Sequence, residues 1–315
     1  MLESHRIMFL PLPKSGCTSL LWMLADLDGL DGARFRDSVM AEVSQSMTIH
    51  DTSRWDERHL WAAYDNDEQE QIQADDSWLR FTVVRDPAPR LWSAWQSKLL
   101  LKEPRFVARF GEAAWFPHDV VDLDGAISSF RSFVRALDVR AEDAPHDAHW
   151  GPQTGLIDGF RLNYHGRAER PDATVHRIDE HLSAGVHLDQ RVPRENSAPV
   201  PYHRSVYDDE TAAIVNRVFA EDFERFGYEP LADVSSGDSE QMWRPTAETA
   251  VGFAAQLSER HLRIGTLLDQ LGQARDSESR MMEQLRAQSD RVHAIEHSRS
   301  WRVTRPLRAL RRNDA

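Results

Sequence analysis

Cysteine is nearly absent from this chain: its 315 residues include only Cys17. A single thiol excludes a disulfide framework and a zinc site of several cysteines, and it is typical of a reducing compartment such as a cytoplasm. Long hydrophobic runs are also missing, because no window approaches the ~18 apolar residues that a membrane-spanning helix needs. The first apolar run, Ile7 to Leu12, shows no small-residue cleavage pattern and leads into Pro13 and Lys14, so it does not read as a signal peptide.

Positive charge is the next deficit. Lys and Arg number 38 against 51 Asp and Glu, which gives a net charge of −13 and argues against broad nucleic-acid binding, since that needs a basic surface. The deficit is uneven, because six Arg and one Asp from Arg299 onward give the tail +5 and leave −18 on the rest. An acidic body with a basic tail predicts two regions with different roles.

Apolar runs closed by turn residues predict a three-layer α/β fold of P-loop-like type, with a central parallel sheet. Residues 6–13 predict a buried strand, and a helix is expected over 18–26. The pattern recurs with a strand at 79–84 and a helix from about 88 to 102. Strand, loop and helix in this order are typical of the opening of an α/β fold.

Further elements complete the predicted body. A third strand is expected at 173–178, and helical spacing of apolar residues predicts a helix within 208–226. A Ser- and Gly-containing run then predicts a linker. The predicted organisation is a domain over 1–232, a linker over 233–246, a helical segment over 247–298 and a basic tail over 299–315.

The helical segment carries an incomplete heptad pattern, interrupted by Glu278. One heptad position holds Leu257, Ile264, Leu271, Leu285 and Val292. The companion position offers only Leu268 and Met282 as apolar residues. Self-association through a coiled coil is therefore a hypothesis for this segment.

The loop after the first strand predicts an anion site. It reads Pro-Lys-Ser-Gly-Cys-Thr-Ser over 13–19, and a loop that opens a helix leaves backbone N–H groups aimed at a ligand. Lys14 adds positive charge, and Thr18 and Ser19 add hydroxyls. The nucleoside-triphosphate P-loop needs its Lys after a second Gly, so that motif fails here. A proline-bracketed turn with a capping Thr remains the alternative.

The second strand also ends in an anion-binding pattern, Arg-Asp-Pro-Ala-Pro-Arg-Leu-Trp-Ser over 85–93. Ligands of open α/β sheets bind outside the carboxyl ends of the strands. Arg85 is suited to grip a phosphate through two hydrogen bonds, and Ser93 adds a neutral donor.

These two motifs resemble those of the sulfotransferases, specifically the carbohydrate branch with the chondroitin, dermatan and heparan 2-O enzymes. That family's 5′-phosphosulfate loop reads roughly Pro-Lys-x-Gly-Cys-Thr, matched at 13–18. Its 3′-phosphate motif reads roughly Val-Arg-Asp-Pro-x-x-Arg-Leu-x-Ser-Ala, matched at 84–94. The resemblance covers about residues 5–230. The family's typical ending is matched by Tyr207, Asp222, Phe223, Phe226 and Tyr228.

The resemblance implies a sulfotransferase that uses 3′-phosphoadenosine 5′-phosphosulfate (PAPS) as co-substrate, needs no metal and sulfates a hydroxyl of a glycan or glycolipid. Direct transfer in the family makes Cys17 a packing residue rather than a nucleophile. The residues expected to bind the donor are Lys14, Ser15, Gly16, Cys17, Thr18, Ser19, Arg85 and Ser93. Lys14 is also expected to be catalytic, because charge grows on the leaving phosphate beside it.

An acceptor hydroxyl needs a base, and three histidines are candidates. His149 is the first choice, because it lies in a His-Trp segment that resembles one in the chondroitin-type enzymes. His50 and His59 are alternatives, because the heparan 2-O enzymes carry their catalytic His between the two nucleotide motifs. Trp150 is the candidate substrate contact.

The basic tail and the compartment stay open. Residues 298–312 join Arg to Trp, Leu and Val, as in segments that rest on anionic membranes, and they resemble tails of bacterial glycosyltransferases that build surface polysaccharides. We expect a bacterial-type cytoplasmic enzyme, peripheral at the membrane face, with a solvated disordered tail as the alternative. The rival functions are a nucleotide kinase of related fold and an inactive assembly protein that acts through its helical tail.

Overall fold

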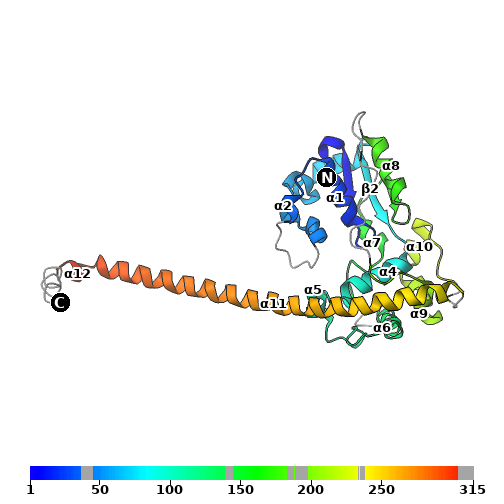
Figure 1. Cartoon of the computed structure of the whole chain (residues 1–315). Helices are drawn as coiled ribbons and strands as arrows, with labels where there is room; N and C mark the ends of the chain where they lie inside the picture. Colours follow the sequence, from blue (N-terminus) through cyan, green and yellow to red (C-terminus); the bar gives the residue numbers. More distant parts are fainter. Residues whose placement is uncertain are drawn as a thin grey trace. The chain divides into compact units, whose positions relative to one another are not determined.

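The computed structural model describes residues 1–36, 45–138, 145–182, 188, 198–232, 234 and 238–303. The chain forms two compact units, Met1–Leu262 and Arg263–Ala315 (Figure 1). Each unit is described by itself. The first holds the sheet, both anion-binding motifs and most of the helices.

A parallel sheet with the order β1-β2-β3 forms the centre of the first unit. Its strands are β1 (Ile7–Leu10), β2 (Leu79–Val84) and β3 (Tyr164–Arg167). Phe81 in the middle strand lies opposite Phe9 on one side and Tyr164 on the other. The prediction of a mixed α/β fold with a central parallel sheet is confirmed.

The third strand predicted at 173–178 is wrong, because these residues belong to helix α8 (Pro171–His181). Val175 and Ile178 are three residues apart, which places them on one face of a helix, and both are buried. Pro171 in the first turn also favours a helix start. The actual third strand, β3, lies at the edge of the sheet and shows no alternation of apolar residues.

Helices cover both faces of the sheet. Leu79, Phe81 and Val83 of β2 pack against side chains of α1 and α8, whereas Val84 packs against α7 and α10. The bounds of these helices are α1 (Cys17–Leu27), α7 (Gln153–Ile157) and α10 (Ala220–Phe226). The alternation of β2 side chains therefore places it between two helical layers.

A second core of the first unit lies among helices and the loops that join them, away from the sheet. Trp92 and Trp95 stack on each other at 5.1 Å and meet the edge of Phe130. The helices around this core are α4 (Pro87–Trp95), the π-helical turn η6 (Gln96–Leu100), α5 (Pro104–Phe110), α6 (Leu123–Ala136) and α9 (Asp209–Val218). The short turn η7 (Arg204–Val206) adds Val206 to this core. Elsewhere in the unit lie α2 (Ala33–Arg36), α3 (Asn66–Ala74) and the short 3₁₀ turns η1 (Glu3–His5), η2 (Gln45–His50), η3 (Thr52–Arg54), η4 (Glu57–His59) and η5 (Trp61–Ala63).

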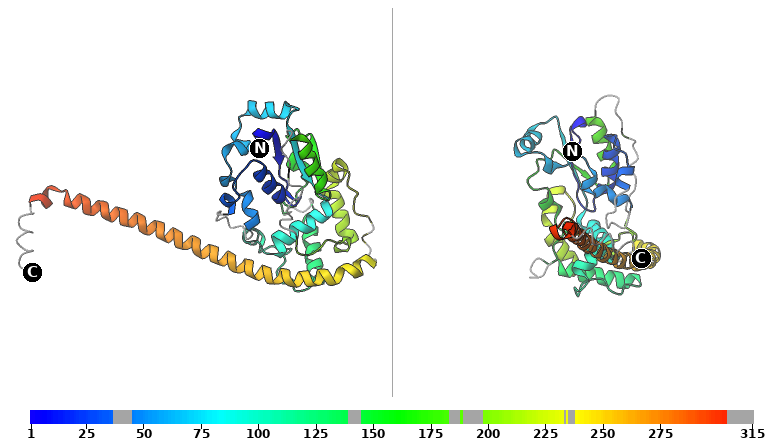
Figure 2. Two further views of the ribbon diagram at one scale, coloured as in Figure 1. Left: turned by 45° about the horizontal axis from the view of Figure 1, so that its top comes forward. Right: turned by 90° about the vertical axis from the view of Figure 1, so that its left-hand side faces the viewer.

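The long helix α11 (Asp238–Glu296) begins inside the predicted linker. Trp243 donates a hydrogen bond to the Pro201 carbonyl at 2.9 Å, and Val251 and Ala254 are buried in the helical core. Figure 2 shows this first part of α11 along the helices of the first unit. The polar run that predicts a linker therefore contains a Trp that anchors α11 to the first unit. The compact unit extends to Leu262.

The second unit continues α11 to Glu296 and adds the short helix α12 (Arg299–Val303). The helical character of 247–298 agrees with the prediction, whereas a coiled coil stays a prediction. Leu271 and Leu285 are about half exposed. Residues 304–315 of the predicted basic tail lie outside the described residues. Among the described helices, none combines the length and apolar character needed to cross a bilayer.

Candidate active site

The loop between β1 and α1 has an unusual backbone. Lys14 has φ +67° and Gly16 has φ +86°, and the left-handed region is uncommon for a residue with a side chain. Ser15 holds the turn by donating its hydroxyl to the Leu12 carbonyl at 2.8 Å. Gly16 is the N-cap of α1, so the first N–H groups of the helix, which have no acceptor within it, point toward this loop.

Among the described residues, the Lys14 ammonium forms no ion pair with a carboxylate. Burial is the main reason why its pKa falls to about 8, and the nearby Lys98 and Arg85 charges lower it further. Within the described ranges, no carboxylate lies within ion-pair distance of Lys14. A desolvated cation of this kind is stabilised when an anion binds beside it.

Arg85 follows β2 and reaches the same loop. Its Nη1 donates a hydrogen bond to the Lys14 carbonyl at 3.1 Å, so the tips of the two neighbouring strands are joined. Burial lowers the pKa of Arg85, and in the part of the chain described here no carboxylate forms an ion pair with it. The structure thus brings together Lys14 and Arg85, two residues that the resemblance assigns to opposite ends of one ligand.

The other residues predicted to bind the co-substrate lie in α1 and α4, the helices that follow the two strand ends. Cys17, Thr18 and Ser19 form the first turn of α1 and are buried, and Ser93 is buried in α4. Burial raises the pKa of the Cys17 thiol. The thiol therefore stays protonated, which suits packing rather than nucleophilic attack.

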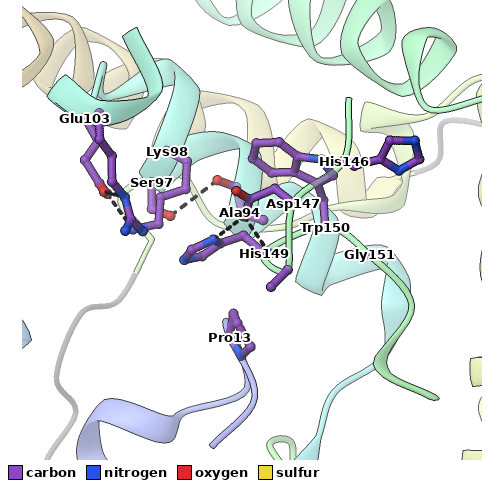
Figure 3. A network of polar contacts seen from close by, with 12 residues as sticks. Pro13, Ala94, Ser97, Lys98, Glu103, His146, Asp147, His149, Trp150 and Gly151 are labelled. Carbon is purple, nitrogen blue, oxygen red and sulfur yellow. Dashed lines mark hydrogen bonds and ion pairs between the residues drawn. The ribbon is translucent and has the colours of Figure 1, made fainter. Parts of the chain in front are cut away.

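His149 forms a dyad with Asp147 (Figure 3). Its Nδ1 lies 2.6 Å from Asp147 Oδ1, and the same oxygen accepts the His149 backbone N–H at 3.0 Å. These bonds and the Arg109 charge lower the pKa of Asp147, so the carboxylate is ionised and can only accept. The proton must therefore lie on Nδ1, which leaves Nε2 with the lone pair of a base. Burial lowers the pKa of His149 and keeps it neutral near pH 7.

The two alternative histidines have different surroundings. His50 Nε2 lies 3.0 Å from the Thr18 hydroxyl, at the first turn of α1, and burial lowers its pKa to about 4. His59 Nε2 lies 2.8 Å from Asp28, which caps the opposite end of α1, about 16 Å away at 1.5 Å per residue. His50 therefore belongs to the candidate site, and His59 does not.

Trp150, predicted as a substrate contact, lies in the helical core. It is 2% exposed, donates to the Pro145 carbonyl at 2.9 Å, and packs against Phe106 and Phe133. Its burial leaves little of the indole for an acceptor, and the residue instead anchors the loop that carries His149.

Arg90 is a site residue that sequence reasoning missed. It is buried and donates to the carbonyls of Pro13 at 3.1 Å, Gly151 at 2.8 Å and Ala148 at 3.1 Å. It therefore ties the lysine loop to the loop that carries His149. Its position as the second Arg of the Arg-Asp-Pro-x-x-Arg motif was the available signal.

Two residues of the carboxyl-terminal motif, Asp222 and Tyr207, hold the backbone around Arg85 in position. Asp222 accepts the backbone N–H groups of Gln153 and Thr154, both at 2.8 Å. The Gln153 side chain accepts the Arg85 N–H at 2.9 Å and donates to its carbonyl at 2.8 Å. Tyr207 donates to the Ala88 carbonyl at 2.8 Å, which holds the first turn of α4 in the same way. These contacts explain why residues more than a hundred positions away accompany the Arg85 motif.

Sequence reasoning also missed Lys98 and Glu103. Lys98 is buried in η6 and forms an ion pair with Glu103. Both residues lie near His149 in Figure 3. As for metal ligands, no cluster of His, Cys, Asp or Glu that could hold an ion occurs in the described ranges.

Comparison with known proteins agrees with this geometry. A model described as "Sulfotransferase family" matches residues 1–229, which span both strand-end motifs and the carboxyl-terminal motif. The chain belongs to the sulfotransferase family. That confirms the sulfotransferase part of the resemblance, and the matched span ends close to residue 230, where the resemblance was expected to end.

Two curated relatives of this sulfotransferase-family chain are carbohydrate sulfotransferase 10 of Xenopus laevis and of Danio rerio. The frog protein is 25% identical over 253 residues, covering 72% of this chain and 66% of the relative. The zebrafish protein is 29% identical over 182 residues, covering 51% of this chain and 45% of the relative. The chain therefore spans about two thirds or less of these relatives. No solved structure matches.

Proposed function

We propose that this protein is a PAPS-dependent sulfotransferase that sulfates a hydroxyl group of a glycan or glycolipid. The observation that carries the proposal is the contact between Arg85 and the Lys14 carbonyl. It supports one binding site for a ligand with two separate anionic groups, and PAPS carries such groups at its 3′ and 5′ positions.

In this proposal the donor spans the two strand ends. Lys14 and the first N–H groups of α1 hold the 5′-phosphosulfate, since helix N-termini favour anions. Arg85 holds the 3′-phosphate, with Ser93 as a neutral donor. Because ATP lacks a 3′-phosphate, Arg85 is the residue expected to separate the two nucleotides.

Transfer then needs one base and one stabilising cation. His149 Nε2 accepts the proton of the acceptor hydroxyl while the acceptor oxygen forms a bond to sulfur. The bond from sulfur to the bridging phosphate oxygen breaks, and 3′-phosphoadenosine 5′-phosphate (PAP) leaves with the electron pair. By analogy with phosphoryl transfer, a loose in-line transition state is expected. Lys14 stabilises the negative charge that grows on the leaving phosphate.

The acceptor class rests on the relatives. Both are named carbohydrate sulfotransferases, which supports a glycan acceptor at their level of identity. The rival kinase reading predicts ATP as the phosphoryl donor. The kinase P-loop has its Lys after a second Gly, whereas Lys14 precedes Gly16, and this order disfavours a kinase. A competition experiment between PAPS and ATP distinguishes a sulfotransferase from a kinase.

We further propose that the second unit pairs with a second copy of this chain. Leu271, Leu285 and Val292 of the first heptad position are about half exposed. A second row of about half-exposed residues, Leu267, Met281 and Ile295, follows that position by three residues and is taken here as the companion in place of Leu268 and Met282. In a parallel pair with this seam, Arg291 of one copy would lie beside Glu296 of the other. Light scattering tests this: a dimer that becomes a monomer in the variant Leu271→Glu with Leu285→Glu supports it, and a monomeric unchanged chain contradicts it.

Location is a separate proposal. The arginines and apolar residues of 298–312 suit an anionic membrane surface, which would place the enzyme at a cytoplasmic membrane face. Sedimentation with anionic vesicles and failure to sediment with zwitterionic ones would support this. Equal behaviour with both kinds of vesicle would contradict it.

The function is tested by incubating the full chain with PAPS carrying radioactive sulfur and a cell-envelope extract, then identifying the labelled product. Lys14→Ala is the inactive control. A chain truncated after Leu262 tests the rival function, an inactive assembly protein that acts through its helical tail. This truncation keeps the part of α11 that packs in the first unit. Label transfer that survives truncation supports an enzyme in the first unit, whereas no labelled product from the full chain contradicts the proposal.

A further inference from the structure

Lys98 is a buried cation that the proposed chemistry has not used. It lies in the π-helical turn η6, directly after the helix that carries Ser93. Its Nζ is 2.5 Å from Glu103 Oε2, and Arg105 Nε lies 2.8 Å from the other oxygen of the same carboxylate. Single π-turns inside helices are frequent at functional sites.

Geometry places Lys98 beside the proposed base. The Lys98 ammonium lies 5.4 Å from the centroid of the Phe106 ring, and the His149 ring lies 5.5 Å from the same centroid. Figure 3 shows the Lys98 and His149 side chains close together, with Pro13 of the lysine loop facing them. Lys98 of η6 and His149 of the loop at 145–152 therefore approach the same Phe106 ring, and Arg90 ties that loop to Pro13 of the loop after β1.

Electrostatics agrees with this placement. The Lys98 charge lowers the pKa of Lys14, of His50 and of His149. These groups belong to the loop after β1, to η2 and to the loop at 145–152, so Lys98 is close to all three of these elements. The cations beside these groups are Lys14, Lys98, Arg85, Arg105 and Arg109. The carboxylates are Glu103, paired with Lys98 and Arg105, and Asp147, paired with His149 and Arg109, so positive charge is in excess.

A purely structural ion pair explains less of this arrangement. Buried ion pairs contribute little net stability, because the desolvation cost offsets the attraction. Lys98 also repels Lys14, which is unfavourable until an anion occupies the space between them. The excess of positive charge is explained if a ligand supplies the missing negative charge.

We propose that Lys98 and Lys14 together form the subsite for the sulfonate group of the donor, with Glu103 holding the Lys98 ammonium in place. This rests on the proposed function. The sulfonate carries the negative charge that the space lacks, and it is the group that distinguishes PAPS from PAP. Lys98 therefore contributes to sulfonate recognition and to transfer, whereas Arg85 contributes to recognition of both nucleotides.

The test compares the affinities of PAPS and PAP, measured by calorimetry without acceptor on the full chain. In Lys98→Met the dissociation constant of PAPS is expected to rise about tenfold relative to that of PAP. The affinity for PAP itself is expected to stay within twofold of that of the unchanged chain. Turnover is expected to fall about a hundredfold. The matched control is Lys102→Met, because Lys102 is also a Lys of this region but its ammonium bonds the His118 carbonyl, and here the ratio should not change.

A second variant protects the test against misfolding. Lys98→Met with Glu103→Gln removes both charges, so no carboxylate is left buried without its Lys, and it should show the same loss of PAPS preference. An unchanged ratio in either folded variant, or equal weakening of PAPS and PAP, overturns the sulfonate subsite while leaving the proposed function intact. Failure of the unchanged chain to bind either nucleotide overturns both.

Discussion

The guanidinium of Arg85 donates a hydrogen bond to the backbone carbonyl of Lys14 at 3.1 Å. The two residues are 71 positions apart in the chain, and the contact exists because β1 and β2 are adjacent parallel strands whose carboxyl ends meet. It joins the loop proposed for the 5′-phosphosulfate to the residue proposed for the 3′-phosphate.

Replacing Arg85 with Ala is expected to weaken donor binding more than it lowers turnover. A charge-assisted hydrogen bond contributes about 1.5–3 kcal/mol, which corresponds to a ten- to hundredfold loss of PAP affinity by calorimetry. Arg260→Ala, an exposed Arg on α11, is the control. If Arg85→Ala weakens the binding of PAP and of 5′-AMP equally, Arg85 does not contact the 3′-phosphate.

Replacing Lys14 with Met is expected to lower kcat by about a hundred- to a thousandfold, the range seen when one stabilising donor is removed from a transition state. PAP affinity should change much less, because the α1 N–H groups and Arg85 remain. Steady-state kinetics with varied PAPS measure the separation. A variant that keeps its kcat and loses only affinity would contradict the catalytic role.

His149→Gln is expected to reduce kcat by about 10²- to 10⁴-fold, as for removal of a general base. Asp147→Asn should also reduce it, since an amide can donate to Nδ1 and so move the proton to Nε2. His59→Gln is the comparison, because His59 pairs with Asp28 at the far end of α1. If His50→Gln abolishes transfer and His149→Gln does not, His50 is the base.

The dependence of kcat/KM for PAPS on pH is expected to be bell-shaped. The acid limb reports His149, whose pKa is lowered by burial, and activity is lost as pH falls because a protonated imidazole cannot accept a proton. The alkaline limb lies near the Lys14 pKa of about 8, because the neutral amine no longer attracts the phosphosulfate. Lys14→Arg should shift the alkaline limb to higher pH. If the alkaline limb does not shift, a group other than Lys14 causes it.

Arg90→Met is expected to destabilise the first unit by about 3 kcal/mol, since an intramolecular hydrogen bond contributes about 1 kcal/mol and three are lost. Burial lowers the pKa of Arg90 to about 10, so it remains charged in the physiological range. Thermal unfolding followed by circular dichroism measures the loss. An unchanged midpoint would show that the two loops hold their positions without it.

Contiguous motifs explain which parts of the site were predictable. Lys14 and Gly16 share one loop and Arg85 directly follows a strand of β-branched residues, so local sequence reveals both their chemistry and their place. Arg90 was visible in the same motif, but its role depends on the carbonyls of Gly151 and Ala148, which only the fold brings near. Lys98 was hidden, because its pairing with Glu103 and its approach to the Phe106 ring depend on packing.

Packing also explains the fold elements that were missed. The segment at 173–178 has β-branched residues, yet its apolar positions are three apart, and burial against the sheet decides in favour of a helix. The true strand β3 has little apolar character, because it is short and lies at an edge. Trp243 lies within a polar run that predicts a linker, and its contact with the Pro201 carbonyl belongs to tertiary structure.

The central claim is that Lys14 and Arg85 hold opposite ends of one nucleotide. The most direct measurement is a structure of the full chain with PAP, in which the distances from these two side chains to the phosphates are measured. The account predicts one nucleotide with its 5′-phosphate about 3 Å from the Lys14 ammonium and its 3′-phosphate about 3 Å from the Arg85 guanidinium. A nucleotide that contacts only one of the two residues, or that binds elsewhere, would contradict it.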